Sequence, residues 1–151
     1  MNLVFEMNEK LTEKLKKKYP KLFKLLNEYN ENSGKYMPIE AFGIECNDGW
    51  YPLIDNICSG IKKICLKNNV KIPVVHQIKE KFGGLRFYIG TVNKKVSKEV
   101  FDIIHKGEKV SYNICENCGT KDNVELYNKG YIKVRCEDCY EEEKNGDFDV
   151  K

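Results

Sequence analysis

The sequence predicts an α+β fold, in which a small helical and β-hairpin domain is followed by a C-terminal four-cysteine zinc ribbon. Apolar residues recur at helical spacing in three stretches, one stretch alternates around a Gly-Gly pair, and two Cys-x-x-Cys pairs stand near the C-terminus. The order helix, helix, hairpin, helix and cysteine module is typical of the α+β class. We therefore expect an α+β domain over residues 1–110, the ribbon over 111–140 and an acidic tail over 141–151.

Lysine-rich helices are predicted over residues 9–30, where leucines recur at helical spacing. Pro20 favours the start of a second helix after a break. Seven lysines crowd the polar side of this stretch. They suit either a phosphate backbone or a plain solvated face, and the interspersed glutamates favour the solvated face.

A core helix is predicted over residues 49–68, because its apolar residues form a continuous stripe. Asp48 is placed to cap its first turn. Cys58 and Cys65 lie on the stripe, where free cysteine behaves as a small hydrophobic residue. Cys46 lies outside any pattern, and the sequence assigns it no role.

The hairpin over residues 72–90, "IPVVHQIKEKFGGLRFYIG", is predicted to turn tightly at Gly83 and Gly84. Alternation then divides its side chains between two faces. One face is apolar and also holds His76 and Glu80. The other face holds three cations and no acid.

Like charges opposed across two strands cost up to about 1 kcal/mol, and local misfits of this kind often mark functional sites. A phosphate, a nucleic-acid strand or an acidic protein surface would relieve the repulsion. The alternative is that acids elsewhere in the fold neutralise the cations, and the candidates are Glu40, Glu45 and Asp102. The candidate binding residues are Lys79, Lys81, Arg86 and Tyr88.

A further helix is predicted over residues 97–106. Ser97 is placed as its N-cap, and Gly107 as its C-cap.

The segment "CENCGTKDNVELYNKGYIKVRCEDC", residues 115–139, has seventeen residues between two Cys-x-x-Cys pairs, which is zinc-ribbon spacing. Gly119 supplies the free backbone that a metal-binding knuckle tends to need. Four protein thiolates fill a tetrahedral site and leave no position for water, so the expected Zn²⁺ is structural. The predicted ligands are Cys115, Cys118, Cys136 and Cys139.

The strands between the two cysteine pairs carry a basic and aromatic set that suits nucleic-acid backbone contact and base stacking. Bracing of the fold or contact with a protein is an equally open role for the ribbon. The set consists of Tyr127, Lys129, Tyr131, Lys133 and Arg135.

Bulk composition favours a cytoplasmic protein. Seven cysteines are an odd number for a disulfide scaffold, and neither a secretory signal nor a membrane span is recognisable. The net charge is +3 although the last residues are acidic, so the rest of the chain is more basic than the total implies. This weakly favours an anionic partner.

Three blocks occur in the order "GIECNDGWYPLID", "QIKEKFGGLRFYIG" and "CENCG" with "VRCEDC". Over roughly residues 40–140 they resemble a family of small, uncharacterised proteins of bacteriophages and prophages. The resemblance implies a zinc-ribbon-like end and a host-cell cytoplasmic setting, but no activity. Many relatives have a tryptophan in the ribbon loop, and Tyr131 is the candidate to stand in for it here.

The leading hypothesis is a non-enzymatic phage or prophage accessory protein that binds nucleic acid or another phosphate-bearing ligand through the cationic hairpin face. The alternative is a counter-defence or host-takeover protein that binds and inhibits a host protein. An enzyme is the least favoured hypothesis, because no hydrolase, phosphate-loop, zinc-protease or deaminase motif is present. The sequence does not indicate the oligomeric state.

Overall fold

The computed structural model describes residues 6–28 and 37–149, and the side chains of 147–149 are outside that description. The fold is mixed α+β. In chain order the elements are α1 (Glu9–Lys18), α2 (Lys24–Asn27), α3 (Pro38–Phe42), β1 (Ile44–Glu45), η1 (Asp48–Trp50), α4 (Tyr51–Lys67), β2 (Val75–Lys81), β3 (Gly84–Ile89), α5 (Ser97–Val110), η2 (Ser111–Asn113), β4 (Val124–Lys129), β5 (Tyr131–Cys136) and α6 (Glu137–Asp149).

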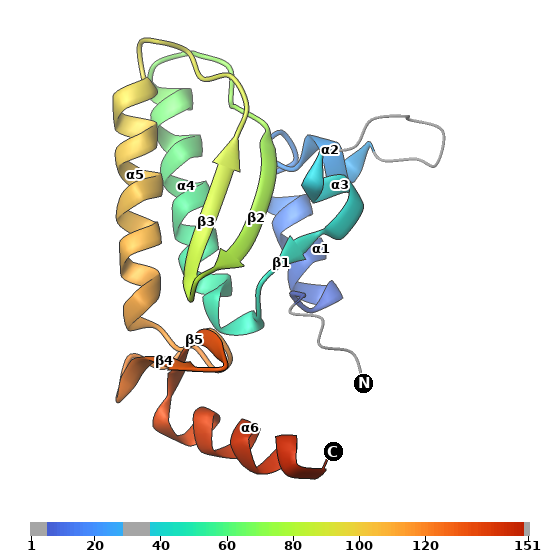
Figure 1. The fold of residues 1–151 in the computed structure, drawn as a ribbon. Helices are drawn as coiled ribbons and strands as arrows, with labels where there is room; N and C mark the ends of the chain where they lie inside the picture. Colours follow the sequence, from blue (N-terminus) through green and yellow to red (C-terminus); the bar gives the residue numbers. More distant parts are fainter. Residues whose placement is uncertain (1–5, 29–36, 150–151) are drawn as a thin grey trace.

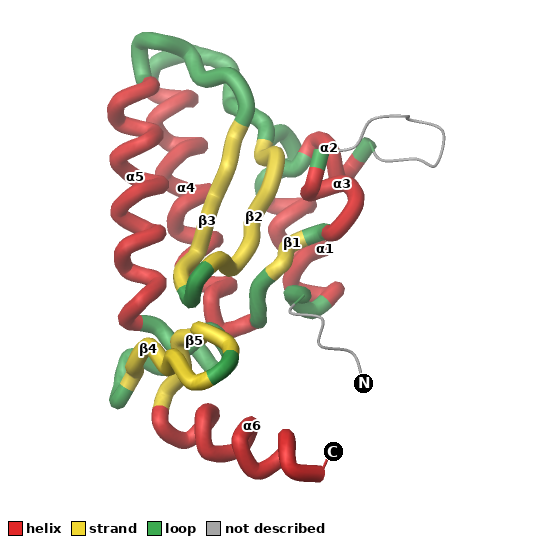
Figure 2. Tube along the Cα trace, viewed as in Figure 1, coloured by secondary structure: helices red, strands yellow, loops and turns green. Residues whose placement is uncertain are grey.

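A three-stranded sheet in the order β1-β2-β3 forms the centre, with β1 parallel and β3 antiparallel to β2. Helices α4 and α5 cover one face of this sheet, α1 to α3 lie beside β1, and β4, β5 and α6 lie beyond the hairpin tip (Figure 1). Figure 2 shows the chain passing from α5 through a loop to β4, β5 and α6. Within the described ranges, no helix is long and apolar enough to cross a membrane.

The lysine-rich helices predicted over 9–30 form as two short helices with a break. Helix α1 begins after Asn8, whose side chain accepts the Lys10 N–H at 2.7 Å, and it ends before Tyr19. Turns beginning at Pro20 lead into α2. Residues 29 and 30 lie outside the described residues.

Helix α4 lies within the predicted range 49–68 and carries the centre of the core. Cys58 and Cys65 are fully buried on its apolar stripe, and Cys46 is buried beside it in the same core. Asp48 does not cap α4 as predicted, because its carboxylate accepts the backbone N–H of Asn8 at 2.7 Å. It therefore ties the start of α1 to the start of α4.

Helix α5 is one turn longer than predicted. Ser97 makes no capping hydrogen bond, and the helix continues through Gly107 to Val110. Gly107 is buried against α4, where a Cβ atom would lie 2.5 Å from the Cδ1 atom of Ile57. This glycine allows two helices to approach closely and does not end the helix.

The central hairpin turns at Phe82 and Gly83, one residue earlier than predicted. Both turn residues have positive φ, at 52° and 88°, as a tight type I′ turn requires. Lys79 consequently lies opposite Arg86, and Lys81 opposite Gly84. Each cross-strand partner moves by two positions, so the predicted division of faces is unchanged.

The sheet has one register shift in β2 and side-chain hydrogen bonds along the edge of β3. A register shift between Val75 and Gln77 leaves His76, predicted on the apolar face, outside the strand pairing. Along the outer edge of β3, the backbone N–H of Leu85 donates to Ser111 Oγ at 3.0 Å. The N–H of Phe87 donates to Glu108 Oε2 at 2.9 Å.

The cysteine module consists of the loop that carries Cys115 and Cys118, the antiparallel β4–β5 hairpin, and α6, which follows β5 directly. Its strands turn around Gly130, whose φ is 87°. Residues 141–149 of the predicted acidic tail belong to α6, and residues 150–151 lie outside the described residues.

Candidate metal centre and hairpin surface

The four predicted cysteines meet at one point of the cysteine module. Cys115 and Cys118 lie in the loop after η2, Cys136 ends β5, and Cys139 stands in the first turn of α6. Their four Sγ atoms all lie within 4.8 Å of one another, and the Sγ atoms of Cys118 and Cys136 are 3.7 Å apart. Such a group could hold a metal ion.

N–H groups point at these sulfur atoms. The Cys118 N–H donates to Cys115 Sγ at 3.5 Å, the Cys139 N–H donates to Cys136 Sγ at 3.4 Å, and Asn117 Nδ2 donates to Cys139 Sγ at 3.2 Å. Burial acts to raise the pKa of the Cys115 thiol, but donated N–H groups outweigh it and the net pKa is lowered. The surroundings thus favour the thiolate of Cys115, whereas burial raises the pKa of Cys118 and raises the pKa of Cys139 to about 12.

A buried ion pair lies directly beside the cysteines. Glu116 Oε1 lies 3.1 Å from Arg135 Nη1, and each side chain is 1% exposed. Arg135 Nε also donates to Glu143 Oε1 on α6 at 2.6 Å. Burial raises the pKa of Glu116 against the opposing effects of the Asn47 N–H and Arg135. This network is fully hydrogen-bonded, as buried charges require.

The "GIECNDGWY" block is where the cysteine module joins the α+β core. Glu116 Oε2 accepts the Asn47 N–H at 2.9 Å, and the Gly49 N–H donates to the Glu116 carbonyl at 2.8 Å. A Cβ atom on Gly49 would lie 2.3 Å from the carbonyl oxygen of Cys115. Trp50 is fully buried and donates its Nε1–H to the Ile114 carbonyl at 3.0 Å. This block is therefore a structural joint.

Three of the five basic and aromatic residues, for which nucleic-acid contact and bracing were both left open, make contacts within the module. Arg135 is buried, Lys133 pairs with Glu143 at 2.8 Å, and the Tyr127 ring stacks on Tyr140 with centroids 3.6 Å apart. Lys129 and Tyr131 stay exposed. The sequence analysis did not predict the structural roles of Glu116 and Arg135. The available signal was that each of these charged residues is adjacent in sequence to a predicted cysteine ligand.

Comparison with known proteins gives no relative from which the role of these residues could be inferred. No family model, curated protein or solved structure matches the chain. The hairpin surface is accordingly described from its own contacts.

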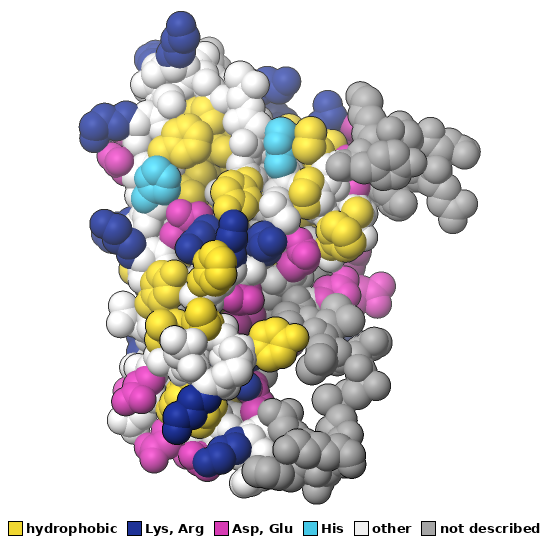
Figure 3. All heavy atoms as spheres, viewed as in Figure 1, with side chains coloured by type: hydrophobic (Ala, Val, Ile, Leu, Met, Phe, Trp, Pro, Cys, Tyr) yellow, Lys and Arg dark blue, Asp and Glu magenta, His cyan; other side chains and the backbone are white. Residues whose placement is uncertain are grey.

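The cationic hairpin face lies on the side of the sheet opposite α4 and α5. Figure 3 shows dark blue side chains gathered in the middle of this face, with hydrophobic side chains next to them. Among the described residues, Lys79, Lys81 and Arg86 form no ion pair. Arg86 Nη1 donates to the Leu85 carbonyl at 3.0 Å, and Tyr88 is 42% exposed.

Among the described residues, acidic side chains lie at both edges of this sheet, with Glu108 at the outer edge of β3 and Glu45 on β1. Glu45 is the register partner of Lys79, and its carboxylate accepts Gln77 Nε2 at 3.3 Å. Glu40 and Glu45 line a groove of about 700 Å³ together with Lys79. Asp102 pairs with Lys98. The neutralising role that we considered for Glu40 and Glu45 therefore applies to the surroundings of Lys79, and Lys81 and Arg86 make no such contact.

Proposed function

We propose that the four cysteines hold a structural Zn²⁺ and that their module is a zinc ribbon. Zinc–sulfur bonds of 2.3 Å in a regular tetrahedron place the sulfur atoms about 3.8 Å apart. The separation of 3.7 Å between Cys118 and Cys136 supports this fit, as do the N–H groups directed at the sulfur atoms. When bound, the ion cross-links the two knuckles. Four thiolates leave no open coordination position for catalysis.

We further propose that the chain is a non-enzymatic binding protein whose hairpin face holds a phosphate-bearing ligand, with nucleic acid as the favoured class. The observation that carries this proposal is the pair Lys81 and Arg86, which lie on one face of the sheet without an ion-pair partner among the described residues. Repulsion between unpaired cations is relieved when a phosphate lies between them. Tyr88 adds an exposed ring and hydroxyl on the same face.

The test is nucleic-acid binding by a Lys81→Ala/Arg86→Ala variant, measured by fluorescence anisotropy over a range of salt concentrations. Removing two phosphate contacts should weaken binding and lower the steepness of its salt dependence by about two counter-ions. The matched control is Lys94→Ala/Lys95→Ala, which removes two exposed lysines from the loop before α5. Equal affinities in the wild type and the hairpin variant would exclude this face as the site.

The setting we propose is a bacteriophage or prophage accessory protein in the host cytoplasm, and it rests on the resemblance of the three sequence blocks. A second candidate function is binding to a host protein. It is favoured by the exposed apolar side chains Phe82 and Leu126, which are 66% and 51% exposed near the hairpin tip. Pull-downs from host lysate with and without nuclease separate the two, because a bridging nucleic acid disappears with nuclease and a direct protein partner does not.

A further inference from the structure

We infer that the ligand of the hairpin face is single-stranded nucleic acid, with a base stacked on Phe82 while the neighbouring phosphates lie along Lys81 and Arg86. This inference rests on the proposed function and narrows it to one class of ligand.

Phe82 occupies a backbone conformation that does not suit it. Its φ of 52° lies in the left-handed region, which is unfavourable for bulky residues and which Asn or Gly adopts readily. It is the first central residue of a type I′ turn, where Asn followed by Gly is the preferred pair. The chain nevertheless places a phenylalanine there, with its side chain 66% exposed.

The Phe82 ring is not part of the hydrophobic core. The turn is held by the Gly83 N–H, which donates to Glu80 Oε2 at 2.7 Å. Gly83 also packs against Leu126 and Ile132 of the cysteine module. The ammonium of Lys81 lies 5.7 Å from the centroid of the Phe82 ring. An exposed ring in an unfavourable conformation, with no part in the core, suits contact with a ligand.

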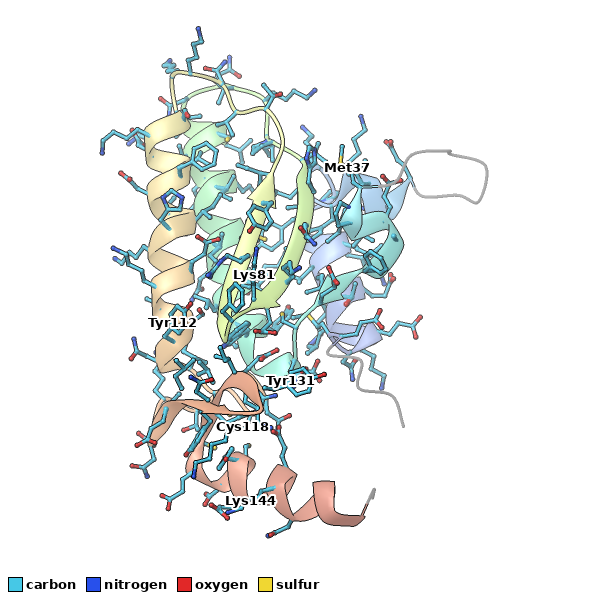
Figure 4. The ribbon with its side chains drawn as sticks, viewed as in Figure 1. Met37, Lys81, Tyr112, Cys118, Tyr131 and Lys144 are labelled. Atoms are coloured by element: carbon cyan, nitrogen blue, oxygen red, sulfur yellow. The ribbon has the colours of Figure 1, made fainter. Side chains whose placement is uncertain are left out.

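The surroundings of Phe82 fit a nucleic-acid strand. Lys81 precedes it on the exposed face, and Arg86 lies two residues beyond Gly84, which is opposite Lys81. Tyr131, 67% exposed, lies on the cysteine module beside the hairpin tip, on the same side of the molecule as Lys81 (Figure 4). The acidic groove beside β1 and the Glu108 carboxylate at the outer edge of β3 both repel phosphates, which favours a strand that follows Lys81 and Arg86 between them.

Single strands and duplexes differ in what they offer to such a surface. A single strand presents unpaired bases that stack on aromatic rings and a backbone that follows cations. A duplex keeps its bases stacked inside and would contact only the cations. The projecting ring of Phe82 therefore has a partner in a single strand and none in a duplex.

The experiment is the binding of a fluorescein-labelled oligothymidylate of about 12 nucleotides, a length within the range of small single-strand sites. Phe82→Asn removes the ring and supplies the preferred turn pair, so its thermal midpoint should equal or exceed that of the wild type while its affinity falls about tenfold. Phe82→Trp keeps a stacking ring and should bind like the wild type. Phe101→Ala removes a ring that is 37% exposed on α5 and is the matched control.

The outcomes separate this inference from the proposed function. If Phe82→Asn binds like the wild type while Lys81→Ala/Arg86→Ala binds weakly, stacking is excluded and the cationic site stands. If a duplex of the same length binds as tightly as the single strand, the inference also fails. If the wild-type protein binds neither at low salt, the proposed function itself is overturned.

Discussion

Glu116 and Arg135 form a buried ion pair 3.1 Å long, and each stands next to a cysteine of the candidate metal centre. Glu116 follows Cys115 along the chain, and Arg135 precedes Cys136. Assembly of the four sulfur atoms and burial of this pair therefore bring the same two chain segments together. The Asn47 N–H on Glu116 extends the connection to the α+β core.

Replacing Arg135 with methionine should lower the free energy of unfolding by about 3–5 kcal/mol, because the Glu116 carboxylate would stay buried without its partner. A Glu116→Gln/Arg135→Met double variant should recover a large part of this loss. Urea denaturation of the three proteins measures the effect. A single variant as stable as the wild type would contradict the structural role of the pair.

Replacing Gly49 with alanine should destabilise the protein by about 1–3 kcal/mol, since the added methyl group would meet the Cys115 carbonyl oxygen at 2.3 Å. Gly146 provides the contrast, because it lies in α6 with nothing within 4 Å of an added Cβ. Gly146→Ala should be neutral or stabilising by about 0.5–1 kcal/mol. Thermal unfolding of both variants tests the joint, and equal midpoints would contradict it.

Stability should fall in acid through Asp55. Partial burial acts to raise its pKa, but the hydroxyl of Tyr19 and the ammonium of Lys18 outweigh this and lower it. A lowered folded-state pKa gives stability that is present above the ordinary Asp pKa and is lost as pH falls through the folded-state value. Asp55→Asn should lose about 1 kcal/mol at neutral pH and show a flatter acid limb in denaturation measured from pH 7 to pH 2.

Metal removal should unfold the cysteine module. We expect about one zinc per chain by elemental analysis, and near-complete loss of it in Cys136→Ser. Cobalt substitution should give the absorption bands of a tetrahedral four-thiolate site. Cys65→Ala, which changes a buried core cysteine on α4, should retain the metal. Equal zinc contents in the wild type and Cys136→Ser would contradict the proposed site.

The features that could be predicted from the sequence are local ones. Two residues between paired cysteines direct both sulfur atoms to one point, and strand alternation assigns Lys79, Lys81 and Arg86 to one face whichever even register the hairpin adopts. These inferences need no knowledge of distant neighbours.

The exact turn of the hairpin depends on contacts far along the chain and was therefore missed. A Cβ atom on Gly83 would lie 2.5 Å from Leu126 Cδ1, and one on Gly84 would lie 2.3 Å from the hydroxyl of Tyr112. The second glycine is thus a packing requirement and not a turn residue. The ion pairs of Arg135 could not be predicted for the same reason, since its carboxylate partners Glu116 and Glu143 lie outside β5.

The side chains of Ser111 and Glu108 accept the N–H groups at the outer edge of β3, and this limits binding of a further strand there. An incoming extended chain cannot extend the sheet there unless it displaces both side chains, so strand addition by a second copy or by a peptide is blocked at Leu85 and Phe87. Recognition through main-chain hydrogen bonds, which depends little on the partner's sequence, is therefore prevented at this edge. Selectivity at the hairpin then depends on its side chains, which point substitutions can alter one at a time.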